Sequence, residues 1–232
     1  MPRLFVFALV TAFSTAAFAD PPPKERPSVD VVFAIDTTSS MQGEIEAVKT
    51  RLKQMVAEID AGTPVPKVRV GLVAYRDRGD AYVTRKLELT RDIDRVVQEL
   101  SKLRAEGGGD TPEDVQEALR VAVTELKWDP APKTSRVLFL VGDAGPHFYP
   151  GEPSMKALGE LAAERGIQVN AIGCGALDAS AASEFAKLAS AGKGHYGALA
   201  RGASEHDGLD AMVTGAVRSE IARHGLRVNP GT

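Results

Sequence analysis

The sequence predicts an α/β fold in which a doubly wound, mostly parallel sheet of six strands carries helices on both faces. The first observation behind this prediction is that short apolar runs alternate with longer amphipathic segments along residues 29–225, which is typical of parallel strands joined by crossover helices. The second is that only residues 76–81 separate two of the predicted strands, so that pair is an antiparallel hairpin. We therefore expect the strand order 3-2-1-4-5-6, with the third strand antiparallel.

Residues 1–19 have the composition of a secretory signal peptide. One charge, Arg3, is followed by an apolar segment, and Ala17-Phe18-Ala19 offers a small-x-small cleavage site before Asp20. The apolar segment is shorter than the roughly 20 residues that a spanning helix needs. We expect cleavage after Ala19, and no membrane span in the mature chain.

Composition limits the organisation and the location of the mature chain. Residues 20–28 form a proline-rich linker, residues 29–225 a single domain, and residues 226–232 a C-terminal tail. A net charge of −3 argues against nucleic acid as a partner. The lone Cys174 allows no internal disulfide, and an exported chain without disulfides is typical of a bacterial periplasm, so we expect a periplasmic or secreted protein.

The first strand of the domain is followed by a loop whose side chains carry carboxylate and hydroxyl oxygens. Residues 31–35 are an unbroken apolar run, as expected for a strand covered on both faces. Asp36, Thr38 and Ser40 follow, and residues 41–59 then show apolar side chains at helical spacing. Ligands of open α/β sheets bind outside the carboxyl ends of the strands. Carboxylate and hydroxyl oxygens at this position suit Mg²⁺ or a similar cation.

The hairpin and the segment after it come next in the chain. Strands are predicted over residues 68–75 and 82–89. The tripeptide Arg78-Gly79-Asp80 between them is one that cell-adhesion receptors recognise, although glycine and aspartate are also ordinary turn residues. A helix over residues 93–103 leads to three consecutive glycines, Gly107 to Gly109, which allow a sharp turn or a close approach of the backbone.

Helix capping is the alternative interpretation of two of these segments. Ser39 and Gln42 fit a capping box. Thr111 fits an N-cap with Pro112 at the first helical position and Asp114 three residues after the cap. A cap accounts for the threonine but leaves the three glycines unexplained.

A second buried strand, over residues 136–141, ends in Gly142-Asp143. In the strand order given above, the first and fourth strands are neighbours at the switch point. Asp36 and Asp143 are therefore expected to meet in one crevice, close to the glycine loop before Thr111. The remaining predicted elements, in order, are a helix over residues 154–165, a strand over 167–174, a helix over 179–191, a strand over 195–199 and a helix over 205–224.

With these segments in order, residues 29–225 resemble the von Willebrand factor A (vWA) domain family, a Rossmann-like fold with a metal-ion-dependent adhesion site. The family pattern Asp-x-Ser/Thr-x-Ser is matched by Asp36, Thr38 and Ser40, its threonine after a glycine-rich loop by Thr111, and its aspartate after the fourth strand by Asp143. The segments 107–114 and 141–147 resemble bacterial and alpha-kinase-associated members in particular.

The resemblance implies a protein-binding module, and not an enzyme. It implies that Thr38 and Ser40 ligate a divalent cation directly, that Asp36 and Asp143 act mostly through water, and that Thr111 acts in either way. The cation would be Mg²⁺, or else Mn²⁺ or Ca²⁺, and a partner protein would supply a further carboxylate. The chain departs from the family pattern at Ser39 and at Ala144, where glycine is common. Movement of the last helix on binding is a further expectation.

Two alternatives stay open. A hydrolase of the haloacid dehalogenase type also binds Mg²⁺ beside an aspartate after the first strand, but it has a second acid two residues later, where this chain has Thr38. A scaffold with a purely structural metal is the other alternative. Dinucleotide binding lacks its glycine fingerprint. His147, His195, His206 and His224 have no zinc-like spacing, and we interpret His147 as a solvated loop residue near the crevice.

Overall fold

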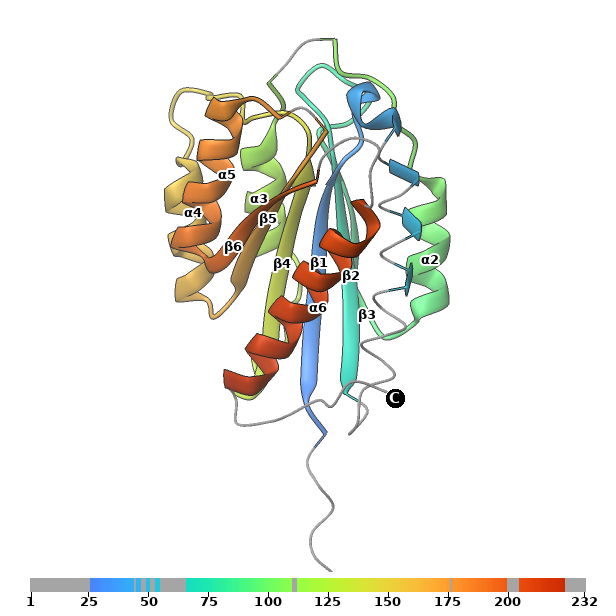
Figure 1. Ribbon diagram of the computed structural model, residues 1–232, viewed down its shortest axis with the longest axis vertical. Coiled ribbons are helices and arrows are strands. Elements are labelled where there is room, and N and C mark those ends of the chain that lie inside the picture. The colour runs from blue at the N-terminus through green and yellow to red at the C-terminus, as the bar shows by residue number, and fades with distance from the viewer. Residues whose placement is uncertain are drawn as a thin grey trace, which may run out of the picture.

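The computed structural model contains a six-stranded sheet in the predicted order, β3-β2-β1-β4-β5-β6 (Figure 1). It describes residues 26–43, 45–46, 49–50, 53–54, 66–109, 112–175, 177–199 and 205–223, the side chains of 205–213 excepted. β3 pairs antiparallel with β2, and the other pairs are parallel. The strands are β1 (Ser28–Asp36), β2 (Lys67–Tyr75), β3 (Thr84–Thr90), β4 (Thr134–Gly142), β5 (Gln168–Cys174) and β6 (Lys193–Leu199).

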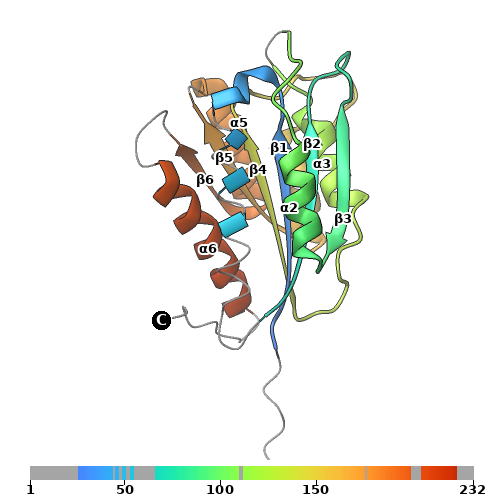
Figure 2. The same ribbon diagram turned by 90° about the vertical axis from the view of Figure 1, so that its right-hand side faces the viewer.

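Helices cover both faces of the sheet, as predicted (Figures 1 and 2). α3, α4 and α5 pack on one face, and α2 and α6 pack on the other. Residues 45–46, 49–50 and 53–54 are also helical, which agrees with the helix expected after the first strand. The other helical elements are the short 3₁₀ helix η1 (Ser39–Gly43), α2 (Ile93–Lys102), α3 (Val115–Thr124), α4 (Met155–Glu164), α5 (Ala179–Ala191) and α6 (Glu205–Arg223).

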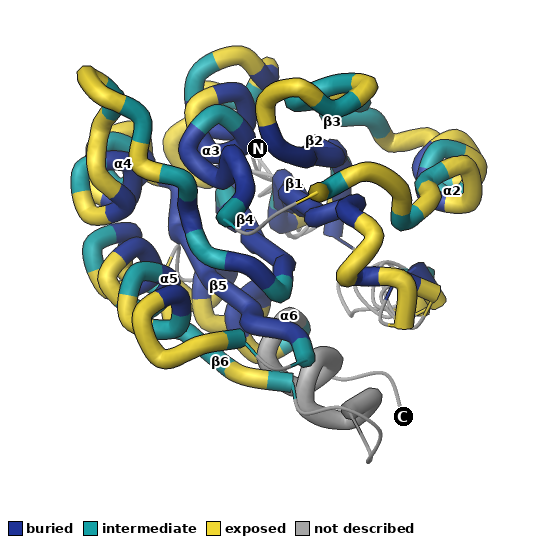
Figure 3. Tube along the Cα trace, turned by 90° about the horizontal axis from the view of Figure 1, so that it is seen from above, coloured by how far each residue is buried: buried dark blue, intermediate teal, exposed yellow. Residues whose placement is uncertain are grey.

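The side chains of β1 pack into two separate cores, because successive side chains of a strand point to opposite faces of the sheet. Phe33 stacks on Phe139 of β4, with ring centroids 5.3 Å apart, in the core under α2 and α6. Val32 and Ala34 point into the other core, under α3, α4 and α5. Seen from above, the central strands are buried and the helices around them expose their outer sides (Figure 3). The apolar run that predicted a strand covered on both faces is therefore confirmed.

The register of the central strands places the carboxyl ends of β1, β2 and β4 at the same height in the sheet. Ile35 of β1 pairs with Val141 of β4, and Asp36 pairs with Tyr75 of β2. The loops that follow β1 and β4 therefore leave the sheet side by side. At the top of the hairpin, the strand predicted to begin at Tyr82 begins two residues later, at Thr84.

No helix in the part of the chain that the structure describes combines the length and the apolar character needed to span a membrane. The predicted signal peptide, the tail of residues 226–232 and most of the linker of residues 20–28 lie outside the described residues.

Candidate metal centre

Four of the five predicted site residues lie in one hydrogen-bonded row. Thr38 donates to Asp36 Oδ1 from its backbone N–H at 2.9 Å and from Oγ1 at 2.7 Å. Thr38 Oγ1 lies 3.1 Å from Ser40 Oγ, and Ser40 Oγ donates to Asp143 Oδ1 at 2.8 Å. The structure thus brings the loops after β1 and β4 together as the strand order requires.

The row runs from the protein interior to the surface. Asp36 and Thr38 are buried, Asp143 is half-buried and Ser40 is exposed. Asp36 Oδ2 is buried and has no hydrogen-bond partner among the described residues. Burial raises the pKa of Asp36 to about 7, and the charge of Asp143 adds to the rise, whereas the two Thr38 hydrogen bonds and the nearby backbone N–H of Asp143 lower it. The Asp143 N–H is too poorly placed to count as a hydrogen bond to Oδ2. A buried carboxylate oxygen without a donor is costly unless a cation compensates it.

The glycine loop after α2 lies against the loop after β1. Gly107 and Gly108 have positive φ angles of 76° and 67°, which glycine adopts without strain. A Cβ at Gly108 would lie 2.9 Å from the Thr38 Cβ, so the backbone approaches Thr38 more closely than a side chain permits. The predicted close approach of this loop is therefore present, and what it approaches is the candidate site.

The capping interpretation of Ser39 is wrong. The Ser39 hydroxyl donates to the carbonyl of Gly107 at 2.6 Å, and the Ser39 backbone N–H donates to the same oxygen at 3.0 Å. These two bonds fix the glycine loop beside the loop after β1. The carbonyl of Thr38 accepts a hydrogen bond from Met41 N at 3.1 Å, at the first turn of η1.

The capping interpretation of Thr111 is also wrong. Helix α3 begins at Val115, and its N-cap is Asp114, whose side chain accepts from Glu117 N. Pro112 precedes the helix and is not its first residue. Thr111 itself lies outside the described residues, so its place as a cation ligand stays a prediction.

Glu113 is a residue beside the site that the sequence reasoning missed. It is buried, and its Oε1 would lie 3.1 Å from a Cβ at Gly108. Burial, and then the charges of Asp36, Glu113 and Asp143, raise the pKa of Tyr75 well above its usual value, which indicates that Glu113 lies near the same phenol as the two predicted site carboxylates. The run of Pro112, Glu113 and Asp114 directly after the glycine loop was the available signal.

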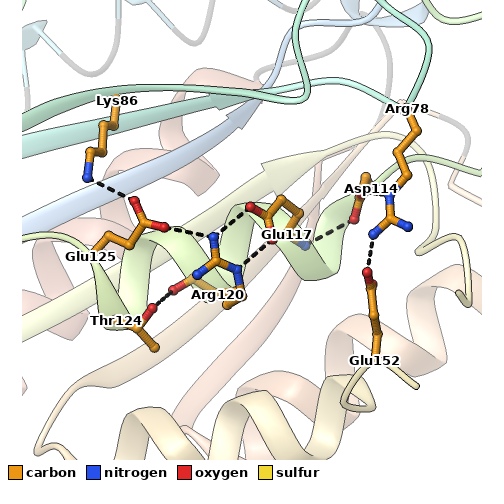
Figure 4. A network of polar contacts seen from close by, with 8 residues as sticks. All are labelled: Arg78, Lys86, Asp114, Glu117, Arg120, Thr124, Glu125 and Glu152. Carbon is orange, nitrogen blue, oxygen red and sulfur yellow. Dashed lines mark hydrogen bonds and ion pairs between the residues drawn. The ribbon is translucent and has the colours of Figure 1, made fainter. Parts of the chain in front are cut away.

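The Arg78-Gly79-Asp80 turn has a structural role, and the contacts of Arg78 are shown in Figure 4. Arg78 Nε donates to Asp114 Oδ2 at 2.7 Å, and Arg78 also pairs with Glu152. Asp80 accepts from the backbone N–H of Gly108, at 3.1 Å to Oδ1 and 3.0 Å to Oδ2. Both charged side chains of the tripeptide thus hold neighbouring loops, which favours the turn interpretation over the adhesion motif.

We expect Asp114→Ala to lower the free energy of unfolding by about 2 kcal/mol, because it removes a buried N-cap of α3 and one partner of Arg78. Urea denaturation followed by circular dichroism measures this. The control is Asp92→Ala, which removes the exposed N-cap of α2 and should cost about 1 kcal/mol. Equal losses in the two variants would show that the contact with Arg78 contributes nothing.

His147 packs beside the site. Its ring stacks on Tyr149, with centroids 4.3 Å apart, and His147 Nδ1 lies 3.7 Å from the Asp77 carboxylate. It is half-buried, so it contacts protein more than a solvated loop residue would. Among the described residues, no three His, Cys, Asp or Glu side chains gather as a metal cluster.

The donor set is suited to a hard divalent cation. It combines two carboxylates with two hydroxyls, all oxygens, and the soft or nitrogen donors that zinc commonly takes in structural sites are not part of it. The Asp36 carboxyl, whose Oδ2 has no hydrogen-bond partner among the described residues, supplies negative charge when it is ionised. The residues present therefore fit a bound Mg²⁺, Mn²⁺ or Ca²⁺.

Comparison with known proteins places this chain in a family. The model of the von Willebrand factor A domain family matches residues 30–206. Human von Willebrand factor A domain-containing protein 7 is 37% identical over 97 residues, which is 42% of this chain and 10% of that protein. The alpha-protein kinase vwkA of Dictyostelium discoideum is 29% identical over 121 residues, which is 51% of this chain and 19% of that protein.

A solved structure shares the fold. Proximal thread matrix protein 1 from the mussel byssus, with a zinc-occupied MIDAS motif, superposes with a TM-score of 0.63 over 88% of this chain and 48% of that one, at 20% sequence identity. A doubly wound α/β domain with oxygen donors after its first and fourth strands is the class of protein that the structure defines. The chain belongs to the von Willebrand factor A domain family.

Proposed function

We propose that this protein is an exported, divalent-cation-dependent protein-binding module. The observation that carries the proposal is the buried Asp36 Oδ2, which has no donor among the described residues and lies in a row of hydroxyl and carboxylate oxygens. Asp36, Thr38, Ser40 and Asp143 would hold the cation, and Thr111 would complete the set. A bound cation would supply positive charge beside Asp36 and an open coordination position toward solvent.

The partner would offer a carboxylate. Mg²⁺ bound mainly by neutral hydroxyls and two carboxylates retains positive character and exchangeable waters. Ser40 and Asp143 form the solvent-facing end of the row, so a partner's acidic side chain can reach that end. Association of this kind requires both the cation and the partner's acidic side chain, so the module would select partners that present an accessible carboxylate.

The hydrolase alternative is weaker on geometric grounds. An aspartate nucleophile must reach a phosphate ester, whereas the Asp36 side chain is fully buried and its Oδ1 accepts two hydrogen bonds from Thr38. No second acid stands two residues later, since Thr38 occupies that position. We therefore propose binding and not catalysis. Absence of turnover of a generic phosphate ester with Mg²⁺ is the expected result.

Ser40→Ala is expected to weaken cation binding by roughly tenfold, because it removes one neutral ligand and the contact with Asp143. Titration calorimetry with Mg²⁺, Mn²⁺ and Ca²⁺ measures the effect. Ser101→Ala is the control, since that exposed hydroxyl donates to a carbonyl of its own helix α2. Equal affinity for Ser40→Ala and the unmodified chain would contradict the ligand assignment.

Partner capture is the test of the function itself. We expect a partner to be retained with Mg²⁺ and released by chelator. At limiting Mg²⁺, its capture should be weaker for the Ser40→Ala variant and unchanged for Ser101→Ala. Amide replacement of the acidic residues of that partner should then identify one whose loss releases it. A partner that stays bound in chelator would refute the proposal. If chelator also lowers the melting temperature while capture is unaffected, the result would favour the scaffold alternative.

The proposed location is the periplasm or the extracellular space, with cleavage after Ala19. N-terminal sequencing of the protein recovered from a periplasmic extract should begin at Asp20.

A further inference from the structure

A cavity lies between β2, β3 and α2. Figure 2 shows these three elements side by side. Its volume is about 380 Å³, which is the size of a small-molecule site. Leu72, Ala74, Leu87 and Leu103 give it an apolar floor. The other described lining residues are Arg76, Tyr82, Arg85, Lys86, Arg95, Glu99, Lys102, Arg104 and Glu106.

The walls of this cavity are strongly basic in a chain whose net charge is −3. Six of the described lining residues are Arg or Lys, and only two are acidic. Lys86 pairs with Glu125, and Lys102 pairs with Glu99. Within the described part of the chain, Arg85 and Arg95 make no ion pair. The cavity therefore carries a net positive charge, most of it on exposed side chains.

Arg76 is the buried member of this group. Its side chain is 6% exposed, and its ion pair is a 3.8 Å contact with Glu106, whose side chain is 68% exposed. Such a long contact with a solvated acid compensates a buried charge weakly. Arg76 Nε donates to the Thr37 carbonyl at 3.1 Å, and Nη2 donates to the Arg104 carbonyl at 3.0 Å. In the described part of the chain, Nη1 makes no hydrogen bond, so two of its N–H groups are available.

Tyr82 contacts two of these guanidinium groups. The Arg76 Cζ lies 4.5 Å from the centre of the Tyr82 ring, and the Arg85 Cζ lies 4.1 Å from it. The Tyr82 hydroxyl is 2.7 Å from Thr37 Oγ1, which fixes the ring in place. Each cation–π contact is favourable and orients its guanidinium group. An anion bound beside Tyr82 would compensate the positive charge of these groups.

We propose that this cavity binds a small organic anion. Its carboxylate or phosphate group contacts Arg76 and Arg85, because planar guanidinium groups match the geometry of both anions. Its apolar part rests on Leu72 and Leu87. The site is separate from the candidate metal centre and needs no cation, so it stands or falls independently of the proposed function.

The test uses phenyl phosphate, benzoate and inorganic phosphate as probes, each titrated into the full chain by calorimetry in excess chelator at constant ionic strength. We expect saturable binding of phenyl phosphate or benzoate, and weaker binding of inorganic phosphate, which lacks the apolar part. Comparison of phenyl phosphate with benzoate shows whether the cavity prefers a phosphate or a carboxylate group. Absence of saturable binding for all three probes would overturn the proposal, and equal binding of inorganic and phenyl phosphate would overturn the role of the apolar floor.

Variants locate the binding. Arg76→Gln and Arg85→Gln should each weaken the tighter probe by about tenfold, the effect of losing one charged hydrogen bond. Arg120→Gln is the matched control, because it removes the same charge on α3, where Arg120 pairs with Glu117 and Glu125. If Arg76→Gln fails to fold, Arg85→Gln carries the test, since the Arg85 side chain is exposed. Equal weakening by Arg120→Gln would assign the binding to overall charge and refute the site.

Discussion

Asp36→Asn is expected to abolish divalent-cation binding without weakening the cation-free protein. Asparagine keeps an acceptor for the two Thr38 donors but lacks the charge that the cation requires. The loss in affinity should exceed roughly 100-fold, more than for a neutral ligand. In chelator at neutral pH, the free energy of unfolding should stay level or rise by up to about 1 kcal/mol, because a neutral amide replaces a buried carboxyl group whose ionised form is costly and whose pKa is therefore raised to about 7.

The matched control lies at the other end of the same strand. Asp30 is buried like Asp36, but Arg69 donates to both of its oxygens, at 2.8 and 2.6 Å, and Asp129 N donates to Oδ2 at 2.7 Å. Asp30→Asn should therefore cost about 2 kcal/mol of stability, because it breaks a satisfied ion pair. Its cation affinity should be unchanged.

Titration calorimetry and urea denaturation, each with Mg²⁺ and with chelator, measure both variants. The expected pattern is a double dissociation, in which one aspartate carries cation binding and the other carries stability. Retained cation affinity in Asp36→Asn would refute the candidate site. A large loss of cation-free stability in that variant would show that the carboxylate of Asp36 is compensated within the fold.

Gly142→Ala is expected to destabilise the protein by about 2 kcal/mol, because the end of β4 has no room for a methyl group. A Cβ at this position would clash with the Tyr75 hydroxyl and lie 3.2 Å from the Asp36 Cβ. Tyr75 is fully buried and its hydroxyl is directed at the Val141 carbonyl at 3.4 Å, so the ring cannot move aside freely. Urea denaturation of the single variant measures the cost.

A double variant separates this clash from other effects of alanine. Tyr75→Phe removes the clashing oxygen and a long hydrogen bond, so alone it should cost less than about 1 kcal/mol. Combined with Gly142→Ala, it should restore most of the stability that the glycine substitution removes. Gly43→Ala, where a Cβ meets no atom within 4 Å, is the neutral control. Additive losses in the double variant would contradict the steric explanation.

The fold was predictable from the sequence because its signals are local. The apolar run before Asp36 and the similar run before Gly142 identify buried parallel strands, and the short connection after Tyr75 identifies the hairpin. The switch-point rule then places the two strand ends together. The structure has the predicted strand order, with Ser40 and Asp143 in hydrogen-bond contact.

The parts that were not predictable depend on contacts between distant segments. Thr111 and Asp114 are both good N-cap residues, and local preference cannot choose between them. The pairing of Asp114 with Arg78 from the hairpin accompanies a helix that begins after Asp114. The basic cavity was likewise invisible, because its residues come from β2, β3, α2 and the loops between them, and only packing unites Arg76 with Arg104.

The row of oxygens also bears on the order of folding events. Ser40 and Asp143 are 103 residues apart in the chain, so they meet only after β1 and β4 have paired. Contacts between such distant residues close large loops and form late. A cation that needs both loops would find no complete site in the early folding chain. Its binding would therefore retard unfolding and leave the rate of folding nearly unchanged.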